Sequence, residues 1–408
     1  MAKQSTSTVT PRLRFPEFRR GGEWSVRALA DVANFQNKKI WSLNVSTADY
    51  VSTENLLPDY GGLALAPKSP AVGSVTQYLV GDVLISNIRP YLKKVWHADR
   101  DGGASNDVIV VRAKETLSNA FLAFVLKSDR FIAYVMLGAK GVKMPRGDID
   151  SMRKYPVGRP SKGEQKKIAD CLTSLDEMIG AQERKVGALR AHKRGLMQQL
   201  FPREGATLPR LRFPEFRNAP EWEQKPAGAF FGNRKEGGEE GLPIYSVTVN
   251  EGMIPRASFD RDFYDIEEPS KNKKACAGDI AYNMMRMWQG AQGVAAEDCM
   301  VSPAYVVLSP VEDVCSRFFA YFFKLPQSLE LLTAHSRGLT KDRLRLYFDD
   351  FARMRLCVPG YEEQQRIASF LVSFDTQIAV ESKQFTILKT HKRGLMQQLF
   401  PSPEGIGT

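Results

Sequence analysis

The sequence holds few of the residues that bind metals or form disulfides. Among its 408 residues are five cysteines and four histidines, and no two cysteines have C-x-x-C spacing. The histidines are too scattered to join the cysteines in one cluster, so we expect neither a zinc site nor a disulfide scaffold. Such cysteine usage is typical of the reducing cytoplasm, which is where we expect the protein to reside.

Long apolar stretches are missing as well. No run comes near the roughly 18 consecutive apolar residues that a membrane-spanning helix needs. The first ten residues are polar and rich in Ser and Thr, and they lack the apolar segment of a signal peptide. We therefore expect neither a membrane span nor a secretory leader.

Catalytic motifs are a third absence. The chain has no phosphate-binding G-x-x-x-x-G-K-[ST] loop, no strand-linked G-x-G-x-x-G, no G-x-S-x-G elbow and no H-E-x-x-H helix. It contains no Pro-Pro, and so lacks the Asn/Asp-Pro-Pro-aromatic motif with which amino-methyltransferases hold a flipped base. Glu223-Gln224-Lys225 fits a nuclease E-x-K, but so short a match is frequent by chance. We expect no catalytic residues and no metal site in this chain.

The composition is that of a globular protein with a basic excess. Hydrophobic residues make up 43% and charged residues 25%, which excludes a disordered or fibrous chain. At roughly 150 residues per domain, the length suggests two or three domains. The formal net charge of +11 permits a polyanionic partner without requiring one.

Two segments of the chain occur twice, letter for letter. The strip Pro11–Arg19 recurs as 209–217, and the segment His192–Pro202 recurs as 391–401. Weaker echoes between these anchors keep nearly the same offset. Identities of this length do not arise by chance, so the chain is a tandem duplication of a unit of about 200 residues.

Each copy begins with a mixed region, roughly 20–160 and 218–358. Short β-rich runs at 107–111 and 304–308 predict strands, while the apolar segments 120–137 and 317–332 predict helical structure. Trp24 and Trp222, just after the repeated strips, are interpreted as core anchors rather than base stackers. These regions predict two α+β globules.

Each copy ends in a long helix with a heptad pattern. Apolar residues step by four and three, and the polar exceptions fall at matching places, which predicts a coiled-coil seam. At about 1.5 Å per residue, such a helix spans roughly 57 Å. The sequence leaves parallel and antiparallel pairing of the two helices open. The seam positions are Ile168, Leu172, Leu175, Ile179, Gln182, Val186, Leu189, Lys193, Leu196 and Leu200 in the first copy, and Ile367, Leu371, Phe374, Ile378, Glu381, Phe385, Leu388, Lys392, Leu395 and Leu399 in the second.

Local signals mark the ends of both helices. Ser161 and Glu164 have the spacing of a capping box, and Gly360 with Glu363 is the weaker equivalent. Pro202 and Pro401 close the two predicted helices. The predicted organisation is a disordered tail 1–10, a globule 11–160, a helix 161–202, a second globule 203–358, a second helix 359–401 and a tail 402–408.

Some regions are identical in the two copies, and others have diverged. The strips and helix ends are identical, whereas the globules have diverged almost beyond recognition. Identity in the helix ends suggests docking to the same partner surface twice; gene conversion between the two ends would leave identity with no binding role. The candidate docking residues are Arg194, Leu196, Met197, Gln198, Gln199 and Phe201, and Arg393, Leu395, Met396, Gln397, Gln398 and Phe400.

Basic residues beside aromatics and glycine turns mark a candidate DNA-binding surface. Arg and Lys neutralise phosphates, and Arg and Gln can also form paired hydrogen bonds with base edges. Any basic protein has such clusters as solvated faces, but these recur at equivalent offsets in both globules. The candidates are Lys38, Lys39, Arg89, Lys93, Lys94, Lys143 and Arg146 in the first, and Lys273, Lys274, Arg286, Gln289, Arg337, Lys341 and Arg343 in the second.

Three repeated features form one pattern: the strips leading into Glu-Trp, the helix starts Glu-Gln-x-x-Ile-Ala at 164 and 363, and the helix ends. This pattern resembles the specificity subunit of type I restriction-modification enzymes. The resemblance covers essentially the whole chain. It implies an α+β fold with two target recognition domains, each reading one half of a split DNA target, and an antiparallel helix pair that fixes the gap. The Gly-x-x-(Lys/Arg) loops at 141–146 and 338–343 match a loop typical of such domains.

The resemblance also implies partners. The repeated segments would bind two adenine methyltransferase subunits, and the complex could recruit ATP-dependent restriction subunits. S-adenosylmethionine, Mg²⁺ and ATP would then be bound by those subunits, and none by this chain. Two other classes stay open: a coiled-coil scaffold for two protein clients without DNA binding, and a stand-alone enzyme such as a nuclease.

Overall fold

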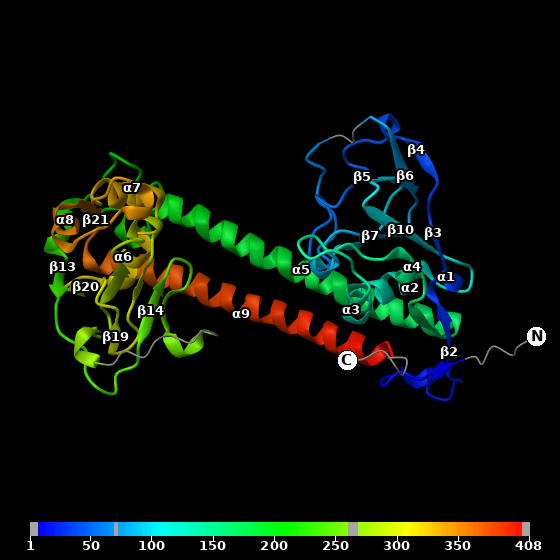
Figure 1. Ribbon diagram of the computed structural model, residues 1–408. Coiled ribbons are helices and arrows are strands. Elements are labelled where there is room, and N and C mark those ends of the chain that lie inside the picture. Colours follow the sequence, from blue (N-terminus) through cyan, green and yellow to red (C-terminus); the bar gives the residue numbers. More distant parts are fainter. Residues whose placement is uncertain (1–6, 69–71, 260–267, 402–408) are drawn as a thin grey trace, which may run out of the picture. The chain divides into compact units, whose positions relative to one another are not determined.

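The computed structural model describes residues 7–68, 72–259 and 268–401. The chain forms two compact units, and each combines one globule with a section of both long helices (Figure 1). Unit 1 contains the residues up to 183 and those from 383 onward, and unit 2 contains residues 184–382. Both units mix helices and strands, which confirms the predicted α+β class.

The globule of unit 1 is built on a four-stranded antiparallel sheet of order β3-β10-β7-β8. Residues 108–111 of its central strand are all buried, because helices and a second sheet cover it on both faces. The other strands of this unit form two further sheets, β4-β6-β9-β5 and β1-β2-β11. The strands are β1 (Thr8–Val9), β2 (Trp24–Ala28), β3 (Ala33–Phe35), β4 (Lys39–Trp41), β5 (Tyr50–Val51), β6 (Ser74–Tyr78), β7 (Val83–Ser86), β8 (Val95–His97), β9 (Gly102–Ala104), β10 (Val108–Ala113) and β11 (Pro156–Arg159).

Unit 2 repeats the order of the main sheet as β13-β20-β17-β18. The predicted strand 304–308 overlaps β20, as 107–111 overlaps β10. The other strands of unit 2 form the pairs β12-β21, β14-β15 and β16-β19. The strands are β12 (Glu223–Pro226), β13 (Phe231–Arg234), β14 (Tyr245–Thr248), β15 (Gly252–Pro255), β16 (Lys273–Ala275), β17 (Ile280–Asn283), β18 (Gln292–Val294), β19 (Cys299–Val301), β20 (Tyr305–Pro310) and β21 (Arg355–Val358).

Each predicted apolar helical segment is broken into two helices. In unit 1 the hydroxyl of Ser128 accepts a hydrogen bond from the backbone N–H of Phe131 at 3.2 Å and caps a new helix. In unit 2 Pro326 opens the second helix, a position where its missing N–H costs nothing. The helices of the globules are α1 (Leu29–Val32), α2 (Asn119–Leu126), α3 (Asp129–Leu137), α4 (Ile149–Arg153), α6 (Ser316–Phe322), α7 (Pro326–Ala334) and α8 (Phe348–Arg353).

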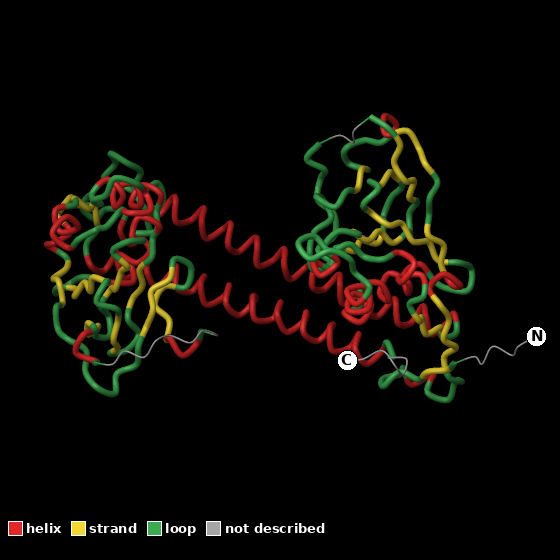
Figure 2. The backbone as a smooth tube through the Cα atoms, viewed as in Figure 1, coloured by secondary structure: helices red, strands yellow, loops and turns green. Residues whose placement is uncertain are grey.

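The two long helices are α5 (Lys162–Leu200) and α9 (Tyr361–Leu399). All the predicted seam positions are buried or partly buried. In unit 1 the start of α5 lies beside the end of α9, where Asp176 pairs with Lys392 at 2.5 Å (Figures 1 and 2). In unit 2 Asp375 near the start of α9 pairs with Lys193 near the end of α5, also at 2.5 Å. The helices are therefore antiparallel, the choice that the sequence left open.

Both cores close around the tryptophan that follows the strip. In unit 1 the Trp24 ring meets the edge of Phe121, which also contacts Phe400 from the end of α9. In unit 2 the Trp222 ring contacts Phe201, from the end of α5, and Phe318. The prediction that these tryptophans are core anchors is confirmed, since Trp24 is 1% and Trp222 2% exposed.

The repeated strip fastens each globule to the helices. Arg14 donates two hydrogen bonds to the Glu164 carboxylate, at 2.7 and 2.8 Å, and Arg212 does the same to Glu363 at 2.8 and 2.7 Å. These bonds raise the pKa of both guanidinium groups. Of the expected capping box only the Ser161 half forms, with the N–H of Glu164 donating to its hydroxyl at 3.3 Å. The Glu164 carboxylate is engaged by the strip instead.

The strip also bonds to the end of the other long helix. The N–H of Leu13 donates to the Gln398 carbonyl at 3.1 Å, and the N–H of Leu211 donates to the Gln199 carbonyl at 2.9 Å. We name these contacts, together with the Arg–Glu pairs, the joint of each unit. Much of the identity between the repeats therefore serves the joint.

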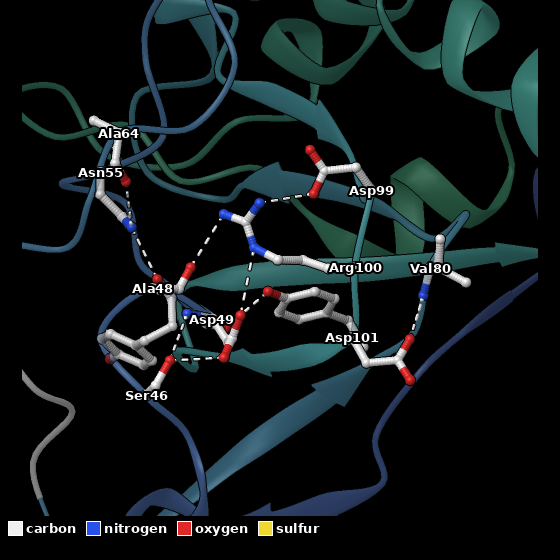
Figure 3. A network of polar contacts seen from close by, with 11 residues as sticks. Ser46, Ala48, Asp49, Asn55, Ala64, Val80, Asp99, Arg100 and Asp101 are labelled. Atoms are coloured by element: carbon white, nitrogen blue, oxygen red, sulfur yellow. Dashed lines mark hydrogen bonds and ion pairs between the residues drawn. The ribbon is translucent and has the colours of Figure 1, made fainter.

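A polar network stabilises the sheet β4-β6-β9-β5 of unit 1, which we name the outer sheet (Figure 3). The Tyr78 hydroxyl donates to the Asp49 carbonyl at 2.7 Å, and burial raises the pKa of this phenol. Asn55 donates to two backbone carbonyls, at 2.8 and 3.1 Å. Gly102 is needed where β9 passes this network, because a Cβ there would collide with the Asp49 carbonyl and the Tyr78 hydroxyl.

In the part of the chain that the structure describes, no helix is both long enough and apolar enough to span a membrane. Within the same residues, no three His, Cys, Asp or Glu side chains are grouped so that they could hold a metal ion.

Candidate nucleic-acid interface

Two loops of unit 1 are hydrogen-bonded into one surface. The first, 87–94, follows β7, and the second, 138–148, joins α3 to α4. The N–H of Arg89 donates to the Pro145 carbonyl at 2.8 Å, and the N–H of Gly147 donates to the Asn87 carbonyl at 3.1 Å. These bonds bring Arg89, Lys143 and Arg146 together, and we name the two loops of each unit the loop pair.

The loop pair of unit 1 has a strained backbone. Arg89 and Lys93 have φ values of 51° and 54°, in the left-handed region that non-glycine residues rarely adopt. They flank a short 3-10 helix, Pro90–Leu92. Such strain costs on the order of 1–3 kcal/mol and is concentrated at functional sites.

Unit 2 has the equivalent loop pair. The loop 284–291 follows β17, the loop 335–347 joins α7 to α8, and the N–H of Leu346 donates to the Met284 carbonyl at 3.0 Å. Arg286 and Gln289 lie on the first loop, and Arg337, Lys341 and Arg343 lie on the second. The structure thus brings together the candidates at 89, 143 and 146, and separately those at 286, 289, 337, 341 and 343.

Half of the candidate DNA-binding side chains are free. They are exposed and form no side-chain hydrogen bond or ion pair with another described residue. A free basic side chain can neutralise a phosphate or reach a base edge without first losing a partner. These residues are Lys38, Arg89, Lys143, Arg286, Gln289, Lys341 and Arg343.

The other candidates are held within their own unit. Burial lowers the pKa of Lys273, whose ammonium donates to the Tyr305 carbonyl at 2.5 Å. The Arg146 side chain and its partner Asp107 are 58% and 41% exposed, so this ion pair is weak and open to exchange. The Arg337 side chain is 64% exposed, but its partner Asp350 is only 13% exposed. The held contacts are Lys39 with Thr76 and Asn106, Lys93 with Asp129, Lys94 with the Thr53 carbonyl, Arg146 with Asp107, Lys273 with Tyr305, Lys274 with Glu239, and Arg337 with Asp350.

The candidates leave out two exposed basic residues of the loop pairs. Lys140 and Arg345 form the closing backbone bridges, opposite Arg146 and Arg337 respectively. Lys140 pairs with Asp148 at 3.1 Å, whereas the Arg345 side chain has no partner among the described residues. The signal was their position just outside the glycine-containing loops 141–146 and 338–343.

Exposure alone does not make an arginine available. Arg100 of unit 1 is 42% exposed, yet it reaches Asp99 at 2.8 Å, Asp49 at 3.5 Å and the carbonyl of Ala48 at 3.1 Å (Figure 3). Its guanidinium also lies 5.5 Å from the centre of the Trp96 ring. Arg100 is therefore a structural residue of the outer sheet.

The repeated helix ends divide into a buried and an exposed half. Leu196, Met197 and Phe201 pack into the core of unit 2, and Leu395, Met396 and Phe400 into that of unit 1. Phe201 and Phe400 are buried and therefore not available to a partner, which is a correction to their place among the candidate docking residues. The two leucines and two methionines are only partly buried, and their docking role stays a prediction. Arg194, Gln198, Gln199, Arg393, Gln397 and Gln398 are exposed, with Arg393 paired to Asp129 at 2.9 Å. Their docking role stays a prediction.

A hollow of about 460 Å³ adjoins the exposed half in unit 2. Gln198 and Gln199 line it, together with Arg203, Arg210 and Gln327. Arg210 belongs to the repeated strip, so this hollow combines both repeated segments.

The comparisons with known proteins agree with this architecture. The family model of the type I restriction modification DNA specificity domain matches residues 21–186 and again residues 239–389. The crystal structure of a type I restriction-modification system S subunit from M. genitalium is similar with a TM-score of 0.62 and 13% identity, covering 97% of this chain and 100% of that chain.

A second solved structure comes from work on complex assembly and conformational transition of the type I R-M system. It is similar with a TM-score of 0.55 and 20% identity, over 92% of this chain and 97% of that chain. At these identities the solved structures show a shared fold. The family model matches most of the chain, and in two copies. The chain belongs to the type I restriction-modification DNA specificity family, and its role is therefore in DNA specificity.

Proposed function

We propose that this chain is the sequence-specificity subunit of a type I restriction-modification complex, in which each globule reads one half of a bipartite DNA target. The observation that carries the proposal is the recurrence of the loop pair. Two diverged globules keep the same two loops, joined by equivalent backbone bonds, and both present free basic side chains. The antiparallel helices fix the gap between the half-sites.

The free side chains divide by chemistry. Lys143 and Lys341 serve as phosphate ligands and supply the salt-dependent part of the affinity. Arg89 and Arg286 have the two-pronged donor geometry that reads guanine in the major groove. Arg146 joins them by exchanging its exposed partner Asp107 for DNA, and Arg337 joins them through the guanidinium donors that do not bond Asp350.

The chain itself is not catalytic in this proposal. Two adenine methyltransferase subunits dock on the exposed halves of the two repeated helix ends, which offer each copy the same surface. S-adenosylmethionine, Mg²⁺ and ATP are bound by partner subunits, and ATP-dependent restriction subunits can join the complex. The assembly works in the cytoplasm, where its DNA substrate lies.

The test is long-read sequencing of modified bases in cells that express the chain with the methyltransferase of its own system. The expected result is a new N6-methyladenine motif made of two short defined parts around a fixed gap. Absence of any new motif, despite a complex that purifies intact, would favour a scaffold without DNA specificity. An electrophoretic shift of the purified chain across salt concentrations gives an independent measure of DNA binding.

The assignment of halves is tested by Arg286→Ala. Loss of one guanine contact should relax one position of one half-motif, at a cost of about 1–3 kcal/mol, and leave the other half unchanged. Lys341→Ala is the matched comparison, because loss of a phosphate contact weakens all sequences evenly and lowers the salt slope by about one. An even loss with Arg286→Ala would remove its base-reading role.

A further inference from the structure

An aliphatic side chain stands fully exposed at the tip of each loop pair. Val142 is 103% exposed and Leu339 is 98% exposed. Both follow a positive-φ glycine, Gly141 or Gly338, and both precede the free lysine of their loop. Neither Val142 nor Leu339 belongs to a hydrophobic cluster of its unit.

The tips are held in place by their loops. Lys140 and Arg146 exchange two backbone hydrogen bonds of 2.9 Å, and so do Arg337 and Arg345. Gly338 has φ +154°, and a Cβ there would lie 2.6 Å from the Arg343 carbonyl oxygen, so the turn requires glycine. The backbone therefore presents these aliphatic side chains in a fixed position.

A single exposed aliphatic residue is ordinary on a protein surface. Its recurrence in both globules is not ordinary. The globules have diverged at most other positions, yet both keep an aliphatic side chain at this tip. Burial in the globule does not account for it. The neighbouring charges, Lys143 and Lys341, are free and suit a polyanionic surface.

We propose that Val142 and Leu339 are specificity-determining residues, each contacting the 5-methyl group of a thymine in its own half-site. This inference rests on the proposed function. The thymine methyl is the apolar group that base pairs present in the major groove, and aliphatic side chains recognise it by contact. Lys143 and Lys341 hold neighbouring phosphates and set how deep the tip enters.

The experiment measures binding of the full-length chain to its bipartite duplex, with uracil replacing each thymine in turn. Uracil lacks only the methyl group, so the wild-type chain should lose about fourfold in affinity at one thymine per half-site, the effect of one buried methyl group. Val142→Ser should bind the thymine duplex as the wild type binds the uracil duplex. It should show no further loss on uracil in that half-site. Leu339→Asn should behave in the same way in the other half-site.

The controls separate failure of this inference from failure of the proposed function. Val80→Ser removes another exposed aliphatic side chain of unit 1, outside the loop pair, and should change nothing. If the wild-type chain binds no bipartite duplex at all, the proposed function fails. If it binds specifically but is indifferent to uracil, or if Val142→Ser and Leu339→Asn respond to uracil as the wild type does, the inference is overturned and the proposed function stands. Equal unfolding temperatures verify that the variants fold.

Discussion

Unit 1 and unit 2 attach their globules to the long helices by matching contacts, yet they differ outside the joint. Arg14 holds Glu164 as Arg212 holds Glu363, with bond lengths that agree within 0.1 Å. The outer strands, by contrast, form one continuous four-stranded sheet in unit 1, whereas in unit 2 the pairs β14-β15 and β16-β19 are joined only by an isolated bridge between Ile244 and Met300 among the described residues. Sequence identity is thus found at the joint, and variation is found at the surface outside it.

The comparison separates the repeated residues that have a role within their own unit from those whose identity still needs a partner to explain it. Arg14 and Arg212 of the strips, the apolar half of the helix ends and the glutamates at the helix starts all have structural roles within their own unit. What remains unexplained is the exposed half of the helix ends, together with exposed strip residues such as Arg210. Four predictions, in order of decreasing effect, test this division.

The largest effect is expected from removing the phenylalanine that each helix end contributes to a core. Phe201 is 1% exposed and contacts the rings of Trp222, Phe318 and Phe322. Phe400 is 7% exposed, and among the aromatic rings of the described residues it contacts only Phe121. Phe→Ala in a core costs about 3–5 kcal/mol. Phe201→Ala should fall at the upper end and Phe400→Ala at the lower, as measured by urea denaturation. An equal or reversed order would contradict the closer packing of unit 2.

Next comes the buried ion pair of the joint. Glu164→Gln or Glu363→Gln leaves a largely buried guanidinium without its carboxylate, which we expect to cost about 3 kcal/mol. Glu164 also accepts a hydrogen bond from Trp24 Nε1 at 3.2 Å, so its replacement should be the costlier one. Glu215→Gln, whose pair with Arg366 is exposed, is the control and should leave the denaturation midpoint unchanged. A midpoint unchanged by Glu363→Gln would show that the joint does not depend on this pair.

These contacts also show what the sequence could and could not predict. Heptad spacing predicted the seam because burial on a helix repeats every few residues, and all its positions are buried or partly buried. The spacing of Ser161 and Glu164 predicted a capping box, but the carboxylate is taken by Arg14, 150 residues away. The sequence also could not predict which lysines of the candidate interface are free. Lys94 and Lys143 look alike in the sequence, but in the structure Lys94 donates to the Thr53 carbonyl.

A smaller effect separates the two core tryptophans. Trp24 Nε1 donates to Glu164, whereas Trp222 Nε1 is buried without a hydrogen-bond partner among the described residues. Replacement by phenylalanine removes a satisfied N–H from unit 1 and an unsatisfied one from unit 2. Trp24→Phe should therefore cost about 1 kcal/mol more than Trp222→Phe in urea denaturation. Equal costs would indicate that the Trp222 N–H finds a partner such as a bound water.

The smallest effect on stability is expected from the exposed glutamines, and it separates folding from docking. Gln198→Ala with Gln199→Ala, or Gln397→Ala with Gln398→Ala, changes only exposed side chains, so stability should shift by less than about 0.5 kcal/mol. Under the proposed function each double variant loses one of two methyltransferase sites, and all four changes together remove both. The masses of the complexes, measured by native mass spectrometry, should fall by one methyltransferase and then by two. Thr173→Ala with Ser174→Ala, exposed on α5 outside the repeated segments, should leave both bound. If the fourfold variant still binds two copies, the glutamines are not part of the docking surface. Their identity in the two repeats would then be a trace of gene conversion.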